Sequence, residues 1–395
     1  MSTKKKPLLL FFSVSGVVGG VEVYICKKWI AFNKNYRIVC VIGKPMGIDY
    51  LRSMIPEVEV IQFPFTSISM KWWNLIKVIA LLLDSSASII HSNDIVTSLW
   101  AKVISSFLFW KRIANVTTIH SVLTEHHIFS ARVERMVFLV FRFLHNVNQF
   151  STICVSKQVF TAMKALRFTN SRSVVIYHGV DSIAPKVEMD RLLTEKVAFA
   201  VVFVGRLSSE KGPDIFVDVI NRTNELLSTV GTSGAIQGIM FGEGKQRRHI
   251  ESLLRGESIK VNGFVQDPDL IYGSADVVCI TSRTESFSFV LFESLARRVP
   301  VFALRLPVFE EIIAYCPYGN LMLCKDIDEM ARKIIALKEG TLSFDFQRLE
   351  GLLERFSKKH EIHRVEELYN RAILGQCFSG AYLYREMDNG EAKGP

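Results

Sequence analysis

Two cations follow a strand-like apolar run in the second half of the sequence. Arg206 and Lys211 lie in the segment 204–213, which ends in Pro213, a residue suited to the first turn of a helix. Arginine presents a planar fork to phosphate and lysine a mobile point charge, so together they suit a diphosphate whose negative charge grows as it departs. The segment predicts a diphosphate site, with two solvated surface charges as the alternative.

Two glutamates lie eight residues apart in the segment 281–293. Glu285 falls in the loop after the apolar run 276–280, and Glu293 lies about five residues into the helix expected next, roughly 7 Å along its axis. Both carboxylates can therefore line one pocket. Apolar residues flank Glu293, where an unpaired carboxylate would be costly, so we expect donors such as sugar hydroxyls to reach it. An exposed helical glutamate is the alternative.

A glycine-rich loop follows the first apolar run of the chain. Gly16, Gly19 and Gly20 lie in the segment 13–22, ahead of a helical stretch. Glycine lets the backbone approach a phosphate, and a helix N-terminus supplies N–H groups. Because the spacing is G-x-x-G-G and the second strand ends without an acid, the loop does not predict a dinucleotide site. A tight turn that packs helix on sheet is the alternative to phosphate contact.

Short apolar runs alternate with helical stretches, which predicts an α/β fold with doubly wound parallel sheets covered on both faces. The expected strands are 8–14, 37–42, 88–91, 113–119, 152–155 and 174–177 in the first half and 197–204, 235–241, 259–264, 276–280, 300–303 and 321–323 in the second. The expected helices are 20–31, 95–109, 131–146, 213–227, 245–254, 288–297, 328–337 and 358–373. Such sheets bind ligands at the carboxyl ends of their strands, which would place the site in a cleft between two domains.

The same pattern predicts where the domains begin and end. We expect an N-terminal domain over 1–180, a polar linker over 181–196 and a C-terminal domain over 197–375. The last helix could cross back to the N-terminal domain, and 376–395 reads as a polar tail.

Composition narrows the class of protein. A chain of 395 residues with 49% hydrophobic content is neither disordered nor fibrous. No uncharged apolar run approaches the roughly 18 residues of a membrane span, and the short apolar run near the N-terminus does not predict a signal peptide. The 7 Cys form no Cys-x-x-Cys pair, which indicates reduced thiols and a cytoplasmic protein.

Positive charge concentrates in the first half of the chain. Residues 1–180 carry 21 Lys or Arg against 8 Asp or Glu, whereas the rest of the chain is net negative. Lys4 to Lys6, and Arg132, Arg135 and Arg142 around the apolar run 136–144, suit an anionic membrane surface. Solubilising charge beside a helix packed on the sheet is the alternative. No nucleic-acid-binding motif accompanies the charge, so we expect no nucleic acid partner.

Several segments, taken together, resemble one family of enzymes. In chain order they are Gly19-Gly20-Val21-Glu22, His178-Gly179-Val180-Asp181, Val204-Gly205-Arg206-Leu207 with Glu210-Lys211-Gly212, Gly242-Glu243-Gly244, Gly263-Phe264-Val265, and Glu285 to Glu293 with Pro300-Val301. From about residue 8 to 373 the chain resembles the retaining, nucleotide-sugar-dependent glycosyltransferases of family four. These enzymes have the GT-B fold, two Rossmann-like domains facing across a cleft. The E-x7-E segment is the specific part of the signature.

The resemblance implies a role for each matching position. Arg206 and Lys211 would bind the donor diphosphate, Glu293 the ribose hydroxyls, and Glu285 the transferred sugar. His120, after the strand 113–119, matches a histidine that the family points at the donor sugar, with a hydrogen-bonded strand-end histidine as the alternative. The implied catalytic residues are Arg206, Lys211, Glu285 and His120. The implied donor-binding residues are Gly19, Gly20, Gly205, Ser286, Phe287, Ser288, Phe289 and Glu293, those of 286–289 through their backbone amides.

The sequence departs from the family pattern at a few positions. Ser286 and Ser288 stand where the family often has the glycines of E-G-F-G, and His178 replaces a frequent Asn. Serine amides can still donate hydrogen bonds, so we expect the site to function. The departures leave the donor, a UDP- or GDP-sugar, open.

Two Asp-x-Asp segments could suggest a metal site. Asp267-Pro268-Asp269 and Asp326-Ile327-Asp328 each precede a helix, so we expect N-caps and no metal ligands. The 9 His show no metal-binding spacing.

The resemblance thus implies a metal-independent retaining glycosyltransferase without a cofactor. It would transfer a sugar to a hydroxyl of a glycan or lipid-linked acceptor in polysaccharide or lipopolysaccharide synthesis, with the N-terminal domain binding the acceptor. We expect a cytoplasmic enzyme, peripheral on the inner face of the membrane. A nucleotide-sugar epimerase on the same fold and a non-catalytic nucleotide-sugar or glycan binder are the alternatives.

Overall fold

A computed structural model gives the fold as two compact units. It describes residues 6–13, 31–43, 52, 58–63, 72–85, 88–121, 150–180, 199–230, 236–254, 256–315, 321–346 and 349–376. Unit 1 comprises 1–179 with 358–395, and unit 2 comprises 180–357. The chain therefore passes between the units twice, and its last helix belongs to unit 1.

Unit 1 is built on a seven-stranded parallel sheet. Its strands are β1 (Leu8–Ser13), β2 (Arg37–Ile42), β3 (Glu59–Gln62), β4 (Ser88–Ser92), β5 (Ile113–Ile119), β6 (Ser151–Cys154) and β7 (Ser173–Val175). Their order, β3-β2-β1-β4-β5-β6-β7, reverses between β1 and β4. Loops that follow neighbouring strands diverge at such a switch point, which opens a crevice where parallel sheets bind ligands.

The described helices of unit 1 are α3 (Trp72–Asp84), α4 (Ile95–Phe107), α7 (Lys157–Ala165) and α15 (Lys358–Leu374). The start of α4 is fixed by Asp94, whose carboxylate accepts from the Thr97 N–H at 2.8 Å. Ser156 caps α7 in the same way through the Val159 N–H. These capped helices follow β4 and β6 directly, as the βαβ pattern requires.

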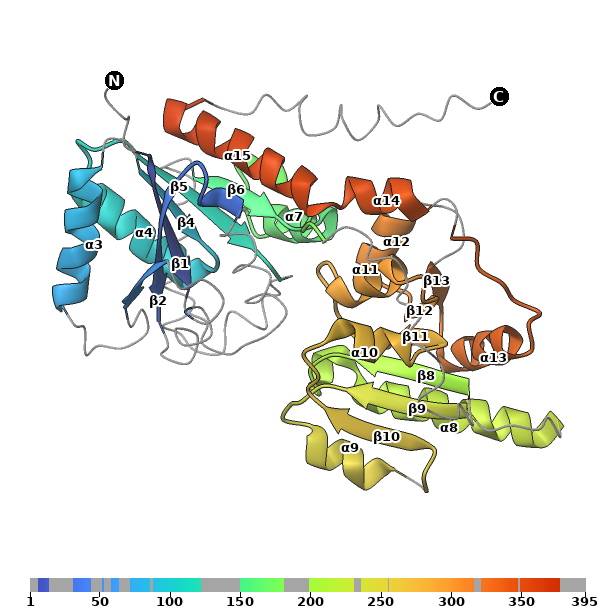
Figure 1. The fold of residues 1–395 in the computed structure, drawn as a ribbon. Helices are drawn as coiled ribbons and strands as arrows, with labels where there is room; N and C mark the ends of the chain where they lie inside the picture. The colour runs from blue at the N-terminus through green and yellow to red at the C-terminus, as the bar shows by residue number, and fades with distance from the viewer. Residues whose placement is uncertain are drawn as a thin grey trace, which may run out of the picture. The chain divides into compact units, whose positions relative to one another are not determined.

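The C-terminal helix α15 packs against β4 and β5 of unit 1 (Figure 1). Tyr369 lies fully buried on this helix, and its hydroxyl is hydrogen-bonded to Nδ1 of His91 in β4. The other ring nitrogen of His91 lies 2.7 Å from the Thr118 hydroxyl in β5. Phe32 and Tyr36 contact the Tyr369 ring, with centroids 5.6 Å and 5.7 Å away. The final helix therefore completes the core of the first unit.

The two segments at which the chain passes between the units, around 179–180 and 357–358, are hydrogen-bonded to each other. In unit 2 the Val180 N–H donates to the Phe356 carbonyl at 2.8 Å, and Val180 forms a parallel bridge with Ser357. In unit 1 the Gly179 N–H donates to the Glu361 carboxylate at 2.9 Å. One hydrogen bond between the two segments therefore lies in each unit.

Unit 2 contains a six-stranded parallel sheet in the order β10-β9-β8-β11-β12-β13. Its strands are β8 (Phe199–Val204), β9 (Ile236–Phe241), β10 (Ile259–Gly263), β11 (Val277–Ile280), β12 (Val301–Leu304) and β13 (Leu321–Cys324). The order reverses between β8 and β11. The prediction of an α/β fold with two Rossmann-like parallel sheets is confirmed.

The helices of unit 2 follow its strands in alternation. They are the short 3-10 turn η2 (Ser209–Lys211), α8 (Pro213–Val230), α9 (Arg247–Leu253), α10 (Pro268–Gly273), α11 (Phe289–Ala296), α12 (Pro307–Ile313), α13 (Ile327–Lys338) and α14 (Leu349–Arg355). Helices α8 and α13 pack side by side, and their buried Phe216, Ile220 and Met330 meet Val201 and Phe203 of β8 in one core.

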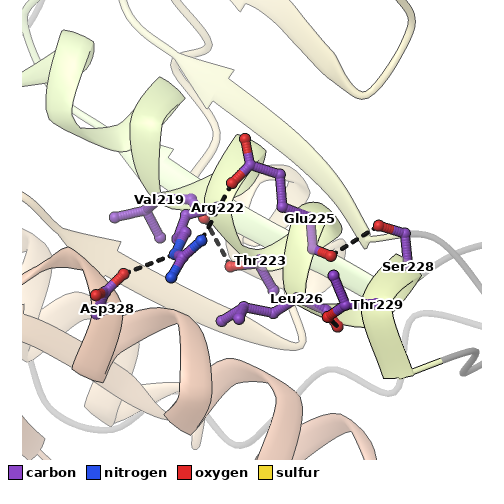
Figure 2. Close-up of polar contacts among 8 residues, drawn as sticks. All are labelled: Val219, Arg222, Thr223, Glu225, Leu226, Ser228, Thr229 and Asp328. Atoms are coloured by element: carbon purple, nitrogen blue, oxygen red, sulfur yellow. Dashed lines mark hydrogen bonds and ion pairs between the residues drawn. The ribbon is translucent and has the colours of Figure 1, made fainter.

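A surface ion pair links these two helices. Arg222 of α8 donates from Nε to Asp328 of α13 at 2.7 Å and from Nη1 to Glu225 at 3.3 Å (Figure 2). The pair is exposed to solvent, so its contribution is small beside that of the apolar contacts beneath it.

Both Asp-x-Asp segments cap helices, as predicted. Asp267 accepts from the Asp269 N–H at the start of α10, and Asp326 accepts from the Glu329 N–H at the start of α13. Asp269 is paired with Arg297 at 2.7 Å and Asp328 with Arg222. In the part of the chain that the structure describes, no three His, Cys, Asp or Glu residues cluster as metal ligands would.

Some sequence predictions lie outside the described residues, and some elements were missed. The expected helices 20–31 and 131–146, apart from Ala31 in the first, and the linker 181–196 are not described. The missed elements include the short, half-exposed strand β3 and the helix α3. Among the described residues, no helix is both long and apolar enough to span a bilayer. The cysteines at 154, 279 and 324 are free thiols, and these three and Cys40 are buried.

We predict that Tyr369→Phe destabilises the protein. The substitution removes the hydroxyl from a buried ring nitrogen of His91, a loss that costs about 1–3 kcal/mol. Urea denaturation followed by circular dichroism measures it. The exposed neighbour Asn370, changed to Ala, serves as the control and should alter stability by less than about 0.5 kcal/mol. Equal stability of the two variants would show that α15 does not depend on this bond.

Candidate functional site

Two loops meet at the switch point of the sheet in unit 2. One follows β8 and contains η2, and the other follows β11. The Thr281 hydroxyl donates to the Gly212 carbonyl at 2.8 Å, and the Arg283 N–H donates to the Glu210 carbonyl at the same distance. Gly212 has a φ of +60°, and a Cβ there would lie 2.2 Å from the carbonyl oxygen of Thr281. Only glycine therefore allows the two loops to come this close.

Lys211 and Glu285 form an ion pair where these loops meet. Lys211 Nζ lies 2.6 Å from Glu285 Oε1, and the Ser282 hydroxyl donates to the same oxygen at 2.8 Å. The Glu285 side chain is 8% exposed and that of Lys211 25%. A cation and a carboxylate are thus held together at the carboxyl edge of the sheet, where they can meet a phosphate and a hydroxyl group of one ligand.

Arg206 lies in the same loop but is much more exposed. Its side chain is 65% accessible, and the guanidinium is 3.5 Å from Glu210. An exposed pair of this length constrains the side chain weakly, so the guanidinium can turn toward an anionic ligand.

The backbone around Arg206 is fixed from the other side by a third loop. Gly242 lies against Gly205, and a Cβ on Gly242 would stand 1.8 Å from the Gly205 oxygen. The Gly205 N–H donates to the Phe241 carbonyl at 3.0 Å, and the Leu207 N–H donates to the Glu243 carbonyl at 2.9 Å. Gly205 therefore serves close backbone packing in this structure.

Glu293 lies in α11 and has a protein donor that the sequence analysis missed. The hydroxyl of buried Tyr272, in α10, donates to Glu293 Oε2 at 2.8 Å. Burial, followed by the negative charge of Glu293, raises the pKa of Tyr272 well above its usual value. The hydroxyl therefore stays protonated and orients the carboxylate. No motif marks Tyr272, because the pairing depends on how α10 packs beside α11.

Three of the four predicted amide donors lie in the loop before α11, and Phe289 is the first residue of that helix. Phe287 is buried and stacks on Phe292, with ring centroids 4.8 Å apart, so its ring serves the core. Ser288 immediately precedes α11 with φ of +77°, a left-handed conformation. Its hydroxyl is buried, and no hydrogen-bond partner for it lies among the described residues. The strained serine turns the chain into the helix, so the N–H groups of the first turn of α11 face this loop.

His120 lies in unit 1, directly after β5. Its Nδ1 is 3.1 Å from Nε2 of His178, and its Nε2 is 3.4 Å from Oδ1 of Asn93. Asn93 follows β4 and also donates to the Phe12 carbonyl at the end of β1. His120 therefore lies at the carboxyl edge of the first sheet, beside its switch point. His178 was noted in the sequence only as a departure from the family pattern.

The structure brings some of the predicted site residues together. Lys211 and Glu285 are in direct contact, Gly205 and Arg206 lie in the same loop as Lys211, and the 286–289 segment leads from Glu285 into the helix that carries Glu293. His120 belongs to the other unit. Gly19 and Gly20 fall outside the described residues.

Two family models match consecutive parts of the chain. Residues 18–182 match the model described as Glycosyltransferase Family 4, and residues 198–339 match the one described as Glycosyl transferases group 1. The first lies on unit 1 and ends just past the unit boundary, and the second covers most of unit 2.

Relatives of known sequence match over shorter stretches. An uncharacterised glycosyltransferase of Methanocaldococcus jannaschii is 27% identical over 191 residues, 48% of this chain and 50% of the relative. A GalNAc-alpha-(1->4)-GalNAc-alpha-(1->3)-diNAcBac-PP-undecaprenol alpha-1,4-N-acetyl-D-galactosaminyltransferase of Campylobacter jejuni is 31% identical over 97 residues, 24% of this chain and 26% of the relative. The matches thus span at most about half the length of these relatives.

One solved structure is similar over nearly the whole chain. The Anabaena protein HepE, solved in complex with UDP and glucose, superposes with a TM-score of 0.74 and 20% identity, covering 92% of this chain and 99% of its own. At this identity the similarity establishes the fold.

We predict that Ser288→Gly stabilises the protein by about 1 kcal/mol. The left-handed serine costs roughly 1–3 kcal/mol of strain, which exceeds the smaller entropic cost of a glycine in the unfolded chain. Thermal and urea denaturation measure the change. Ser286→Gly, two residues away and without a positive φ, should give no gain. A loss of stability in Ser288→Gly would show that the loop holds serine without strain.

Proposed function

Since the chain belongs to the glycosyltransferases with the GT-B fold, we propose that it transfers a sugar from a nucleoside diphosphate sugar to a hydroxyl acceptor with retention of configuration. The observation that carries the proposal is the Lys211–Glu285 pair at the switch point of unit 2. It places a cation for a diphosphate beside a carboxylate for sugar hydroxyls, which is the pairing that a sugar diphosphate requires.

In this proposal unit 2 binds the donor. Lys211 and Arg206 contact the diphosphate, and the backbone amides that lead into α11 add hydrogen bonds to it or to the sugar. Glu293, oriented by Tyr272, accepts hydrogen bonds from the ribose hydroxyls. We propose a UDP-sugar as donor, because the structurally similar Anabaena protein was solved with UDP and glucose. No cofactor or metal ion is needed in this scheme.

The chemistry follows from where charge develops. The bond between the anomeric carbon and the phosphate oxygen breaks, and the acceptor oxygen bonds to the carbon on the same face. The acceptor proton passes to the departing phosphate oxygen. Lys211 and Arg206 stabilise the charge that grows on the diphosphate. In this scheme Glu285 holds sugar hydroxyls and does not attack the anomeric carbon, and its Oε1 already accepts from Lys211 and Ser282. For His120 we propose the role that the family resemblance implies, a hydrogen bond to the transferred sugar.

For the acceptor we propose a lipid-linked or growing surface glycan, with the enzyme in the cytoplasm and peripheral on the membrane. The Campylobacter relative is named for an undecaprenol-linked substrate. In unit 1 the end of α4 and the turn after it expose three aromatic side chains: Phe107 is 74% accessible, Phe109 82% and Trp110 61%. Lys111 and Arg112 follow them directly. Aromatic rings next to cations suit the boundary between acyl chains and anionic headgroups. The arginines at 132, 135 and 142 that the sequence analysis named for the membrane surface fall outside the described residues.

The donor site predicts a specific loss of activity. Lys211→Met and Glu293→Gln should each lower kcat/KM roughly thirty-fold or more, corresponding to about 2 kcal/mol of transition-state binding. The assay measures product from UDP- and GDP-sugars with a polyprenyl-linked glycan, with chelator and with added magnesium. Lys333→Met is the matched control, because Lys333 is 26% exposed and also pairs with a glutamate.

Several outcomes of this assay would contradict the proposal. Wild-type turnover by both variants would remove the donor assignment, and activity that requires magnesium would remove metal independence. Interconversion of nucleotide sugars without an acceptor would favour an epimerase. Binding of nucleotide sugar without any product would favour a non-catalytic binder. The anomeric coupling constant of the product measures retention.

The aromatic patch predicts lipid binding. Wild-type protein should co-sediment with vesicles of phosphatidylglycerol and phosphatidylcholine, and less with phosphatidylcholine alone or at high salt, because each basic residue contributes about 1 kcal/mol at an anionic surface. Changing Phe107, Phe109 and Trp110 to Ser should abolish binding. Phe264→Ser, at a 66% exposed position of unit 2, should not. Binding that survives the triple change would place the membrane surface elsewhere, and no binding by the wild type would remove it.

A further inference from the structure

A line of three titratable side chains leads from the interior of unit 1 to His120. Glu361 of α15 is buried, and its Oε2 accepts the Gly179 N–H at 2.9 Å. Its other oxygen, Oε1, lies 3.7 Å from Nδ1 of buried His178. Nε2 of His178 is 3.1 Å from Nδ1 of His120, and the two rings are nearly parallel at 14°. The last helix of the chain thus reaches the candidate catalytic histidine through one intermediate side chain.

The orientation of Asn93 determines which ring nitrogen of each histidine carries a proton. Its amide nitrogen donates to the Phe12 carbonyl at 3.3 Å, so its oxygen faces His120. An amide oxygen only accepts, so Nε2 of His120 carries a proton. In neutral His120, Nδ1 is then an acceptor, and the 3.1 Å contact requires a proton on Nε2 of His178.

Glu361 completes the assignment at the buried end. With Nε2 protonated, neutral His178 has an acceptor at Nδ1, and that atom lies 3.7 Å from Oε1 of Glu361, a contact longer than a hydrogen bond. Burial raises the pKa of Glu361 well above its usual value, and the Gly179 N–H offsets only part of this effect. The direction of this shift favours the protonated acid, and because the Gly179 N–H is bonded to Oε2, we place that proton on Oε1.

We propose that protonated Glu361 and His178 are positioning residues that hold His120 neutral, with its proton on Nε2. In this scheme the Nε2–H of His120 exchanges its 3.4 Å contact with Asn93 for a ligand oxygen when substrate binds. Where the proposed function places a sugar hydroxyl, His120 then acts as a hydrogen-bond donor without a positive charge. A neutral donor there would not oppose the positive charge that develops at the anomeric carbon.

The tautomer can be measured without substrate, so this test does not depend on the proposed function. In full-length protein labelled with ¹⁵N-histidine, the His120 signals are identified by their loss in His120→Gln. At neutral pH we expect a protonated Nε2 and an unprotonated Nδ1. The other neutral tautomer, or a cationic His120, would overturn the proposal. Failure of the transferase assay with the expected tautomer would count against the function alone.

Matched variants separate positioning from structure. His178→Phe keeps a flat ring but removes the donor, so Nε2–H should no longer dominate at His120. We expect kcat to fall roughly ten-fold, the scale seen when an outer partner of a site histidine is lost, while donor KM stays within about two-fold. His178→Gln, whose amide N–H can replace Nε2–H, should recover most of both readouts.

Glu361 has its own pair of variants. Glu361→Gln retains an N–H for His178 and a carbonyl for Gly179, so it should match the wild type in tautomer and kcat. Glu361→Met offers neither and should behave like His178→Phe. A Gln variant as impaired as Met would show that a carboxylate is required and would overturn the role of protonated Glu361. If the His120 tautomer were unchanged in both His178→Phe and Glu361→Met, the proposed positioning role of His178 and Glu361 would be overturned.

Discussion

The geometry of the site in unit 2 depends on the close approach of two backbone segments at the sheet's switch point. The Gly212 carbonyl accepts a hydrogen bond from the Thr281 hydroxyl, and the Thr281 carbonyl oxygen leaves no room for a Cβ on Gly212 between the loops. This approach brings the end of η2 against the loop after β11, and Lys211 meets Glu285 there as a result. Because both partners come from loops anchored at strand ends, the pair is held by the sheet and not by side-chain contacts alone.

Much of this arrangement could be predicted from the sequence because it follows from strand periodicity. The runs at 37–42 and 113–119 are strands with those bounds, and parallel sheets place the loops after them at one edge. The same reasoning predicted three site residues, because each follows a strand and has a side chain suited to phosphate or hydroxyl groups. They are Arg206, Lys211 and Glu285. The helix N-caps Asp267 and Asp326 could also be predicted from the sequence, since capping is a local interaction.

Contacts that depend on packing between distant segments could not be predicted in this way. The sequence analysis required a donor for Glu293 and named sugar hydroxyls, whereas the structure adds Tyr272 from the preceding helix. His178 appeared only as a substitution in a motif, and Glu361 did not appear at all, because their proximity arises from α15 returning to unit 1. The strand β3 was missed since its four residues are half exposed and lack a continuous apolar run.

The return of α15 also has a consequence for synthesis of the protein. Translation produces residues 1–179 first, yet the core of unit 1 includes Tyr369, which contacts His91, Phe32 and Tyr36. The nascent first unit therefore remains incomplete on the ribosome until nearly the whole chain has emerged, whereas unit 2, continuous over 180–357, contains all of its own strands earlier. A chain that terminates before residue 358 would carry a complete second sheet and a first unit with its aromatic core open to solvent, a ready target for chaperones and proteases.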